Sequence, residues 1–156
     1  MTITGNKRRG FSLIELVIVV VIIGIIGAIA IPRMSRGAAG AADASLTADL
    51  AVLRNAIDLY HTEHQGTYPT LAAFVDQMTT YTDQGGSAQA TKGGNFIYGP
   101  YLRAVPELKV KGTGNGSSVV VATLGGAGGW VYDQSTGEIT ANSTDTDDQG
   151  VAYNTY

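Results

Sequence analysis

The first candidate for chemistry is a single carboxylate, Glu15, near the start of a long apolar segment. Between Phe11 and Ile31 it is the only charged residue. As a helix this segment would be ~31 Å long, which matches the hydrocarbon core of a bilayer. A carboxylate in such a segment is costly unless it has a partner, and it therefore marks a functional site. No cation follows before Arg33. The sequence predicts that the partner of Glu15 comes from another chain, or from an amino group that cleavage of this chain creates.

The acidic run at residues 145–150 is the best candidate for a metal site. It begins like an EF-hand calcium loop, with Asp145 and Asp147 at the first two ligand positions and a glycine at the sharp turn. Gln149 and Tyr156 occupy later positions, where the loop needs oxygen ligands such as a bidentate glutamate. Two interpretations stay open, a calcium site and a flexible solvated tail, and the second is favoured.

Other arrangements that could support catalysis or metal binding are weak. His61 and His64 lie three residues apart, but no third ligand accompanies them, so a solvated helix end is favoured. The glycines of 125–129 lack the spacing of a dinucleotide-binding loop and precede a predicted strand, which indicates a turn. The chain has no cysteine, which excludes thiol catalysis and disulfides. We therefore expect a protein that is not an enzyme and needs no cofactor, apart from the calcium alternative.

Glu15 belongs to a motif at the N-terminus. Residues 10–15 read Gly-Phe-Ser-Leu-Ile-Glu and follow the basic run Lys-Arg-Arg at 7–9. The motif resembles the processing site of type IV prepilins and of the pseudopilins of type II secretion systems. The resemblance implies that prepilin peptidase cuts after Gly10 and methylates the new N-terminus at Phe11. It also implies that Glu15 attracts this amine on a neighbouring subunit during assembly.

The same resemblance implies a function, partners and a location. It points to a structural subunit of a type IV pilus-like filament, closest to the major pseudopilin of a type II secretion system. Its partners would be further copies of the chain, minor pseudopilins, prepilin peptidase, the assembly platform of the inner membrane and membrane lipid. The subunit would span the inner membrane once, with a cytoplasmic N-terminus, before it enters a periplasmic or extracellular filament. A type IV pilin for adhesion, motility or DNA uptake is the nearest alternative.

An ordinary secretory signal is the third alternative. The basic leader, the apolar run and the Ala-Ile-Ala sequence at 28–30 meet its requirements, and cleavage there would release a soluble binding module. Glu15 argues against this interpretation, because a disposable signal gains nothing from a costly charge. Helical periodicity also continues beyond Pro32. The basic leader places the N-terminus in the cytoplasm by the positive-inside rule.

Composition narrows the class further. The net charge is −3, and the cations of the leader account for part of the basic side chains, so we expect no broad attraction to nucleic acid. A hydrophobic content of 44% with 21 glycines indicates a small folded domain with tight turns rather than a disordered chain. Many type IV pilins close their C-terminal region with a disulfide, so the absence of cysteine favours a pseudopilin of a type II secretion system.

Four segments follow from these patterns. Residues 1–10 form the leader, 11–32 a hydrophobic transmembrane and filament-core helix, 33–65 an amphipathic helix and 66–156 a small C-terminal α+β domain. Proline removes a backbone hydrogen bond, so Pro32 predicts a helix break or a gentle kink. The resemblance implies that this region unwinds in an assembled filament.

The amphipathic helix carries one apolar stripe. Its members follow 4-3-4-3 spacing: Leu46, Leu50, Leu53, Ile57 and Tyr60. Gly66 is the predicted stop signal. Thr70 is the predicted cap of a short helix that ends near Thr80, with Leu71, Phe74, Val75 and Met78 on one face.

The remaining pattern predicts strands. Residues 117–124 are rich in β-branched side chains, and 129–133 and 137–141 flank a turn at 134–136 that would make a hairpin. Trp130 and Tyr132 should share one face of it. We expect a long N-terminal helix packed on a small antiparallel sheet, a pilin-like α+β fold.

Overall fold

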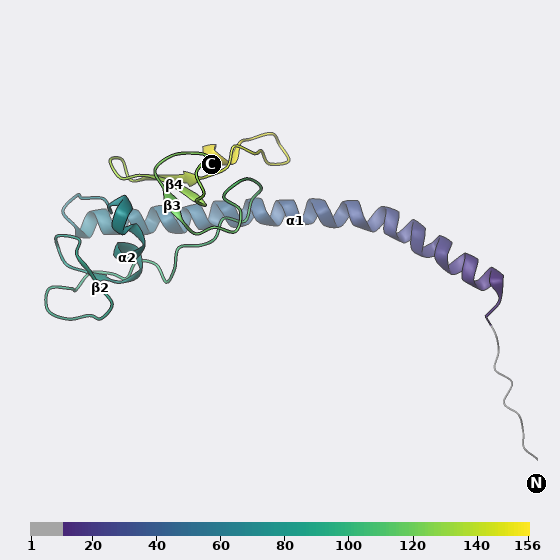
Figure 1. Ribbon diagram of the computed structural model, residues 1–156, viewed down its shortest axis with the longest axis horizontal. Helices are drawn as coiled ribbons and strands as arrows, with labels where there is room; N and C mark the ends of the chain where they lie inside the picture. Colours follow the sequence, from purple (N-terminus) through teal and green to yellow (C-terminus); the bar gives the residue numbers. More distant parts are fainter. Residues whose placement is uncertain (1–10) are drawn as a thin grey trace, which may run out of the picture. The chain divides into compact units, whose positions relative to one another are not determined.

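The computed structural model describes residues 11–156, except for the side chains of residues 29–38 (Figure 1). The chain divides into two compact units, Met1–Ala38 and Ala39–Tyr156. Helix α1, Leu13–Glu63, belongs to both units, and every other helix and strand belongs to the second. The expected α+β class, a long N-terminal helix followed by short helices and small sheets, is confirmed.

Helix α1 includes Pro32, so the helix break predicted there is absent from this structure. The physical reason is that a proline removes one intrahelical hydrogen bond, while the turns on either side keep theirs. Unwinding of this region within a filament stays a prediction. No helix within the described residues combines the length and the apolar character that a membrane crossing requires.

The apolar stripe of α1 forms one wall of the core of the second unit. All five predicted side chains of the stripe are buried, and Leu53 is fully so. The helix then ends as predicted near Gly66. Gln65 and Gly66 both have positive φ angles, of 57° and 80°, and the N–H of Gly66 donates to the carbonyl of His61 at 2.9 Å. This left-handed turn is a common way to end a helix, and it reverses the chain.

Two short helices cover the end of this core. A 3₁₀ turn, η1 (Leu71–Ala73), leads into α2 (Phe74–Thr79). Phe74 and Met78 are buried as the spacing predicts, but Val75 is half exposed. The predicted side-chain cap by Thr70 is wrong. Instead, the backbone N–H of Thr70 donates to the side-chain oxygen of Gln77 at 2.8 Å.

Within residues 11–156, five strands form two small sheets. β1 (Tyr81–Thr82) and β2 (Ala88–Gln89) pair antiparallel. The second sheet has the order β3-β4-β5, with β3 at Val120–Val121, β4 at Trp130–Asp133 and β5 at Glu138–Ala141. The β4–β5 hairpin is confirmed, and Trp130 and Tyr132 share one face of it as predicted, the buried one.

The expectation of a wholly antiparallel sheet is wrong, because β3 pairs parallel to β4. The strand predicted at 117–124 is also only two residues long. The side chain of Asn142 explains the return of the chain between these strands. Its amide donates to the carbonyls of Gly126 and Gly128 at 2.8 and 2.7 Å, and its oxygen accepts from the N–H of Gly125. A buried amide thus holds the glycine-rich loop in the path that a parallel pairing requires.

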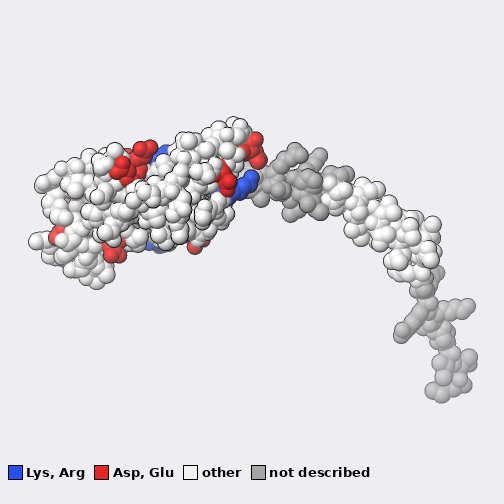
Figure 2. All heavy atoms as spheres, turned by 45° about the horizontal axis from the view of Figure 1, so that its top comes forward, with Lys and Arg blue, Asp and Glu red and all other residues white. Residues whose placement is uncertain are grey.

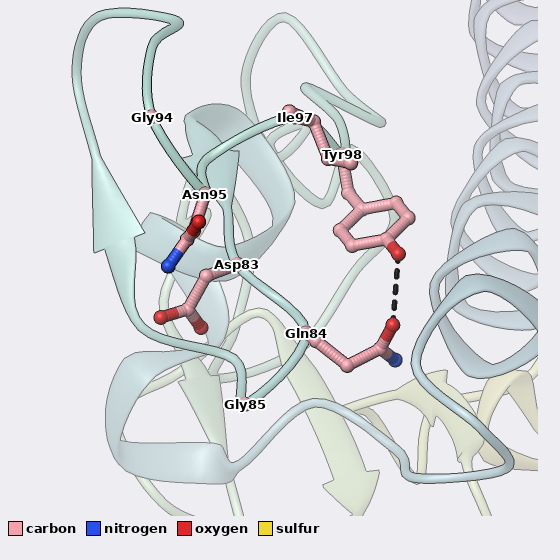
Figure 3. A pocket seen from close by; sticks show the side chains of 7 residues that line it. All are labelled: Asp83, Gln84, Gly85, Gly94, Asn95, Ile97 and Tyr98. Atoms are coloured by element: carbon pink, nitrogen blue, oxygen red, sulfur yellow. Dashed lines mark hydrogen bonds between the residues drawn. The ribbon is translucent and has the colours of Figure 1, made fainter.

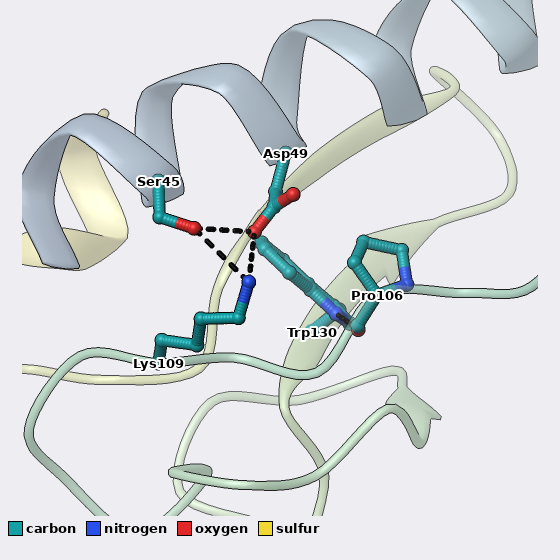
Figure 4. A network of polar contacts seen from close by, with 5 residues as sticks. All are labelled: Ser45, Asp49, Pro106, Lys109 and Trp130. Carbon is teal, nitrogen blue, oxygen red and sulfur yellow. Dashed lines mark hydrogen bonds and ion pairs between the residues drawn. The ribbon is translucent and has the colours of Figure 1, made fainter. Parts of the chain in front are cut away.

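Trp130 and Lys109 each make polar contacts that hold distant parts of the second unit together (Figure 4). The indole N–H of Trp130 donates to the carbonyl of Pro106 at 2.8 Å. The ammonium of Lys109 lies 3.2 Å from the hydroxyl of Ser45 and 3.9 Å from a carboxylate oxygen of Asp49. The ammonium is exposed, so this ion pair contributes at most about 1 kcal/mol. The buried tryptophan is therefore the stronger of the two attachments.

Candidate functional site

The predicted assembly residue, Glu15, lies in the first turn of α1. One oxygen of its carboxylate, Oε2, accepts a hydrogen bond from the backbone N–H of Ser12 at 3.0 Å. Ser12 immediately precedes the helix, and its carbonyl accepts from the N–H of Leu16 at 3.1 Å. This is the glutamate half of a capping box, in which a side chain reaches back to a free N–H at the helix start. A carboxylate is also favoured there by the helix dipole.

The sequence carries a signal for this contact that the sequence analysis missed. Ser-x-x-Glu ahead of an apolar run, here Ser12 to Glu15, is the pattern of a capping box. The prediction above gives Glu15 a partner only from another chain or from an amine that cleavage creates. In the single chain it has a local partner. The contact uses only Oε2, and the other oxygen, Oε1, has no hydrogen-bond partner in residues 11–156. A carboxylate can accept from several donors, so Glu15 keeps capacity for a second one.

The predicted processing site lies at the edge of the described chain. Gly10 is outside the described residues, whereas Phe11 is within them and is 81% exposed. Cleavage after Gly10 would turn the nitrogen of Phe11 into an amine one residue from the N–H that Glu15 already binds. The structure therefore brings two of the predicted site residues, Phe11 and Glu15, to the same helix end.

An apolar surface surrounds this end of α1. Most large side chains from Leu13 to Ile26 are about half exposed or more. The described part of this unit shows no Lys or Arg in the view of Figure 2, where charged side chains gather on the second unit. A continuous apolar surface of this kind indicates a contact with other proteins or with lipid.

The two histidines each stack on a different tyrosine. His64 is buried, and its ring stacks on Tyr60 with centroids 3.7 Å apart. Its two ring nitrogens lie 2.9 Å from the carbonyl of Tyr60 and 3.0 Å from the hydroxyl of Thr82. His61 stacks on Tyr68 instead. The prediction of a solvated helix end is therefore wrong for His64, because Tyr60 of α1 and two tyrosines from the segment between β2 and β3, Tyr98 and Tyr101, cover it. No group of three or more potential metal ligands occurs in the part of the chain that the structure describes.

The acidic run at 145–150 is a turn in which the carboxylate of Asp147 is occupied. Its Oδ1 accepts from the N–H groups of Gln149 and Val151, both at 2.8 Å, and its Oδ2 accepts from the hydroxyl of Tyr156. The residues that follow form a short 3₁₀ helix, η2 (Tyr153–Thr155), with Tyr153 buried. The run is largely exposed, as the favoured interpretation of a solvated tail predicts, but the hydrogen bonds of Asp147 and the helix η2 give it a defined turn; its flexibility stays a prediction. Calcium binding at this run stays a prediction.

These hydrogen bonds make the stability of the acidic turn depend on pH. The hydroxyl of Tyr156, followed by the N–H of Val151, lowers the pKa of Asp147 below its usual value. Because the pKa of Asp147 is lower in the folded state, the charged carboxylate stabilises the turn at any pH above the ordinary carboxyl pKa. This stabilisation is lost as the pH falls through the lowered pKa. We expect amide exchange at Val151 to accelerate as the pH is lowered below about 4.

The measurement is amide exchange by NMR, corrected for the intrinsic pH dependence of exchange. Asp147→Asn should abolish the additional acceleration. Asp148→Asn removes a neighbouring exposed charge and should leave it intact. An acceleration that persists in Asp147→Asn would show that another group controls the turn.

A pocket of about 310 Å³ lies beside β1 (Figure 3). Asp83 is the only carboxylate in its lining, and its Oδ1 already accepts from the N–H of Ser87 at 2.8 Å. The hydroxyl of Tyr98 donates to the side-chain oxygen of Gln84 at 2.8 Å. Asp83, Gln84 and Tyr98 thus already have hydrogen-bond partners, and the lining of this pocket supplies no acid–base pair for catalysis.

Comparison with known proteins supports the N-terminal site. The profile described as "Prokaryotic N-terminal methylation motif" matches residues 5–31, which include Gly10, Phe11 and Glu15. The chain therefore carries the N-terminal methylation motif of type IV pilin-like proteins. Neither a curated protein nor a solved structure matches the chain. The expectation of a pilin-like N-terminus is confirmed at this level.

Proposed function

We propose that the chain is the structural subunit of a type IV pilus-like filament and is a substrate of prepilin peptidase. The methylation motif at 5–31, with Glu15 as its carboxylate, carries this proposal. The role is structural and not enzymatic. Cleavage after Gly10 and methylation of Phe11 would produce the amine that assembly uses.

The geometry of Glu15 supports a pairing mechanism. In the single chain Oε2 is held by the N–H of Ser12, which fixes the orientation of the carboxylate. Oε1 keeps its capacity for a donor, and the methylated amine of an adjacent subunit is a donor with a positive charge. In a medium of low dielectric this attraction is strong, but desolvation of both charges offsets it. The pairing therefore contributes mainly to the register of the entering subunit.

The apolar surface of the first unit supports the location and the partners. Residues 11–32 would lie in the inner membrane, with the N-terminus in the cytoplasm and the second unit outside. The subunit would then meet lipid, the assembly platform, minor pseudopilins and copies of itself. No nucleic-acid partner is proposed, because the net charge is −3.

Within this class we favour the major pseudopilin of a type II secretion system. The chain has no cysteine, and the second unit is short. A surface pilin for adhesion, motility or DNA uptake is the competing assignment. Deletion of the gene distinguishes the two, since loss of protein secretion with normal surface pili supports the pseudopilin.

Processing is tested by substitution of Gly10. Gly10→Val places a branched side chain where a peptidase must approach the backbone, and we expect the mature form to fall at least about tenfold. Mass spectrometry of the membrane-extracted protein should find N-methylated Phe11 at the start of the wild-type chain. The matched control is Ala30→Val, which would block an ordinary signal site and should leave processing unchanged. A wild-type chain that begins at Ile31 would refute the proposal.

A further inference from the structure

The loop that leads into β3 contains a pair of residues that can react with each other. Asn115 is followed by Gly116, and none of the chain's other asparagines precedes a glycine. In such a pair the backbone nitrogen of the glycine can attack the side-chain carbonyl of the asparagine, because glycine has no side chain to hinder the approach. Both residues are exposed, so water reaches the reacting atoms. The pair is therefore a candidate site of spontaneous deamidation.

The reaction consumes only water. The nitrogen of Gly116 forms a bond to Cγ of Asn115, the bond from Cγ to the side-chain nitrogen breaks, and ammonia leaves with the proton of the Gly116 N–H. Water then opens the resulting succinimide ring at either of its two carbonyls, which yields aspartate or isoaspartate. One amide and one water become one carboxylic acid and one ammonia, and the acid carries a negative charge at neutral pH.

The fold restrains the attacking nitrogen. The N–H of Gly116 donates to the carbonyl of Leu108 at 2.7 Å, and the N–H of Leu108 donates to the carbonyl of Ser117 at 3.0 Å. Leu108 is fully buried, so these two hydrogen bonds join the loop to the core. As long as the first bond is intact, the Gly116 nitrogen is engaged with Leu108. Attack on Asn115 therefore requires the loop to open locally.

Close packing also keeps the loop at 112–116 in place. A Cβ on Gly112 would clash with the hydroxyl of Ser143, and a Cβ on Gly114 would lie 2.5 Å from the carbonyl oxygen of Gly128. The N–H of Asn115 donates to the carbonyl of Gly112 at 3.2 Å, which makes the tip a tight turn. The backbone of this loop thus lies directly against its neighbours, and a longer backbone would not fit in the same space.

We propose that Asn115 deamidates spontaneously in the folded protein, at a rate set by local opening of the loop at 112–116. The reaction is slower than in a free peptide of the same sequence, because the hydrogen bond from Gly116 to Leu108 must break first. Isoaspartate adds one methylene to the backbone, and the closely packed loop has no room for it. The modified chain therefore loses the hydrogen bonds between Leu108 and residues 116–117, which loosens the connection into β3.

The proposal is independent of filament assembly, so the test uses the full chain in detergent micelles at mildly alkaline pH. Peptide mapping by mass spectrometry with electron-transfer fragmentation distinguishes asparagine, aspartate and isoaspartate at each position. We expect Asn115 to deamidate before the other asparagines. We also expect it to react at least about threefold more slowly than the acetylated, amidated peptide of residues 112–118, since a backbone hydrogen bond accounts for a factor of this order.

Two variants test whether the loop controls the rate. Gly114→Ala should displace the loop from Gly128 and raise the rate to that of the free peptide. Thr113→Ala changes an exposed side chain in the same loop and should leave the rate unchanged. Near-ultraviolet circular dichroism of Trp130 checks that the Gly114→Ala chain is folded.

Hydrogen exchange of the Gly116 amide gives a measurement that needs no variant. In the wild-type chain, mild urea should accelerate this exchange and the deamidation of Asn115 by the same factor, because both require the loop to open. The proposal is overturned if Asn115 keeps its amide over many half-lives of the free peptide, or if another asparagine reacts first. Equal rates in the folded chain and the peptide, or faster exchange without faster deamidation, would overturn control by the loop.

Discussion

Glu15→Gln is expected to abolish filament assembly and to leave cleavage after Gly10 intact. Glutamine is the other side chain of the capping box, and its oxygen can accept from the N–H of Ser12 as the carboxylate does. The substitution therefore keeps the helix start and removes only the negative charge. Removing one partner of a buried ion pair costs about 3–5 kcal/mol, so filament yield should fall at least about a hundredfold. Sheared filaments quantified by immunoblot measure the yield, and mass spectrometry of the membrane fraction measures processing.

Two companion variants separate charge from helix capping. Glu15→Ala removes both, and it should fail in assembly as glutamine does. Ser12→Pro removes the backbone N–H that donates to Glu15, together with the serine hydroxyl, and keeps the charge of Glu15, so it should assemble far better than Glu15→Gln. A glutamine variant with normal filaments would show that Glu15 serves to start α1, and the pairing mechanism would then be rejected.

The long helix and its buried stripe could be predicted because local periodicity determines them. The five apolar residues from Leu46 to Tyr60 repeat at helical spacing, and a helix with such a face must bury it. The hairpin at 130–141 could also be predicted, since a turn separates two segments in which apolar and polar residues alternate. In each case the residues that decide the structure are neighbours in the sequence.

The direction of β3 could not be predicted because it depends on contacts distant in sequence. Asn142 holds the loop before β4 from 14 to 17 residues away. Gly129 is also required there, since a Cβ on it would lie 1.9 Å from the carbonyl oxygen of Ser117. Nothing in the sequence of residues 117–124 indicates that Gly129 lies so close to Ser117. A β-branched run gave the existence of the strand, but neither its length nor its pairing.

In the candidate site, too, features set by sequence neighbours could be predicted and features set by distant contacts could not. The motif around Gly10 and Glu15 could be recognised in the sequence, because its residues are contiguous. The burial of His64 could not be predicted, because residues distant in sequence enclose it: Tyr98 and Tyr101, between β2 and β3, have ring centroids 5.1 and 6.3 Å from that of His64. Solvation of a polar side chain is decided by what packs over it, and that is a tertiary property.

Trp130→Ala is expected to cause the largest loss of stability in the second unit. The indole is fully buried in the core and donates to the carbonyl of Pro106 at 2.8 Å. Its removal leaves a cavity and a carbonyl without its donor, and we expect a loss of about 3–5 kcal/mol in the free energy of unfolding. Small domains have only about 5–15 kcal/mol in total, so the variant should be close to unfolding at ambient temperature.

The measurement is urea denaturation followed by near-ultraviolet circular dichroism of the 8 tyrosines, because Trp130 is the only tryptophan and its fluorescence is lost in the variant. Val131→Ala is the matched control. It removes a neighbouring side chain on the outward face of β4, where burial is partial, and should cost less than about 1.5 kcal/mol. Trp130→Phe should fall between the two, since it fills most of the space but cannot donate to Pro106. Equal stabilities of Trp130→Ala and Val131→Ala would contradict a core centred on the hairpin, because burial would then not determine the cost of truncation.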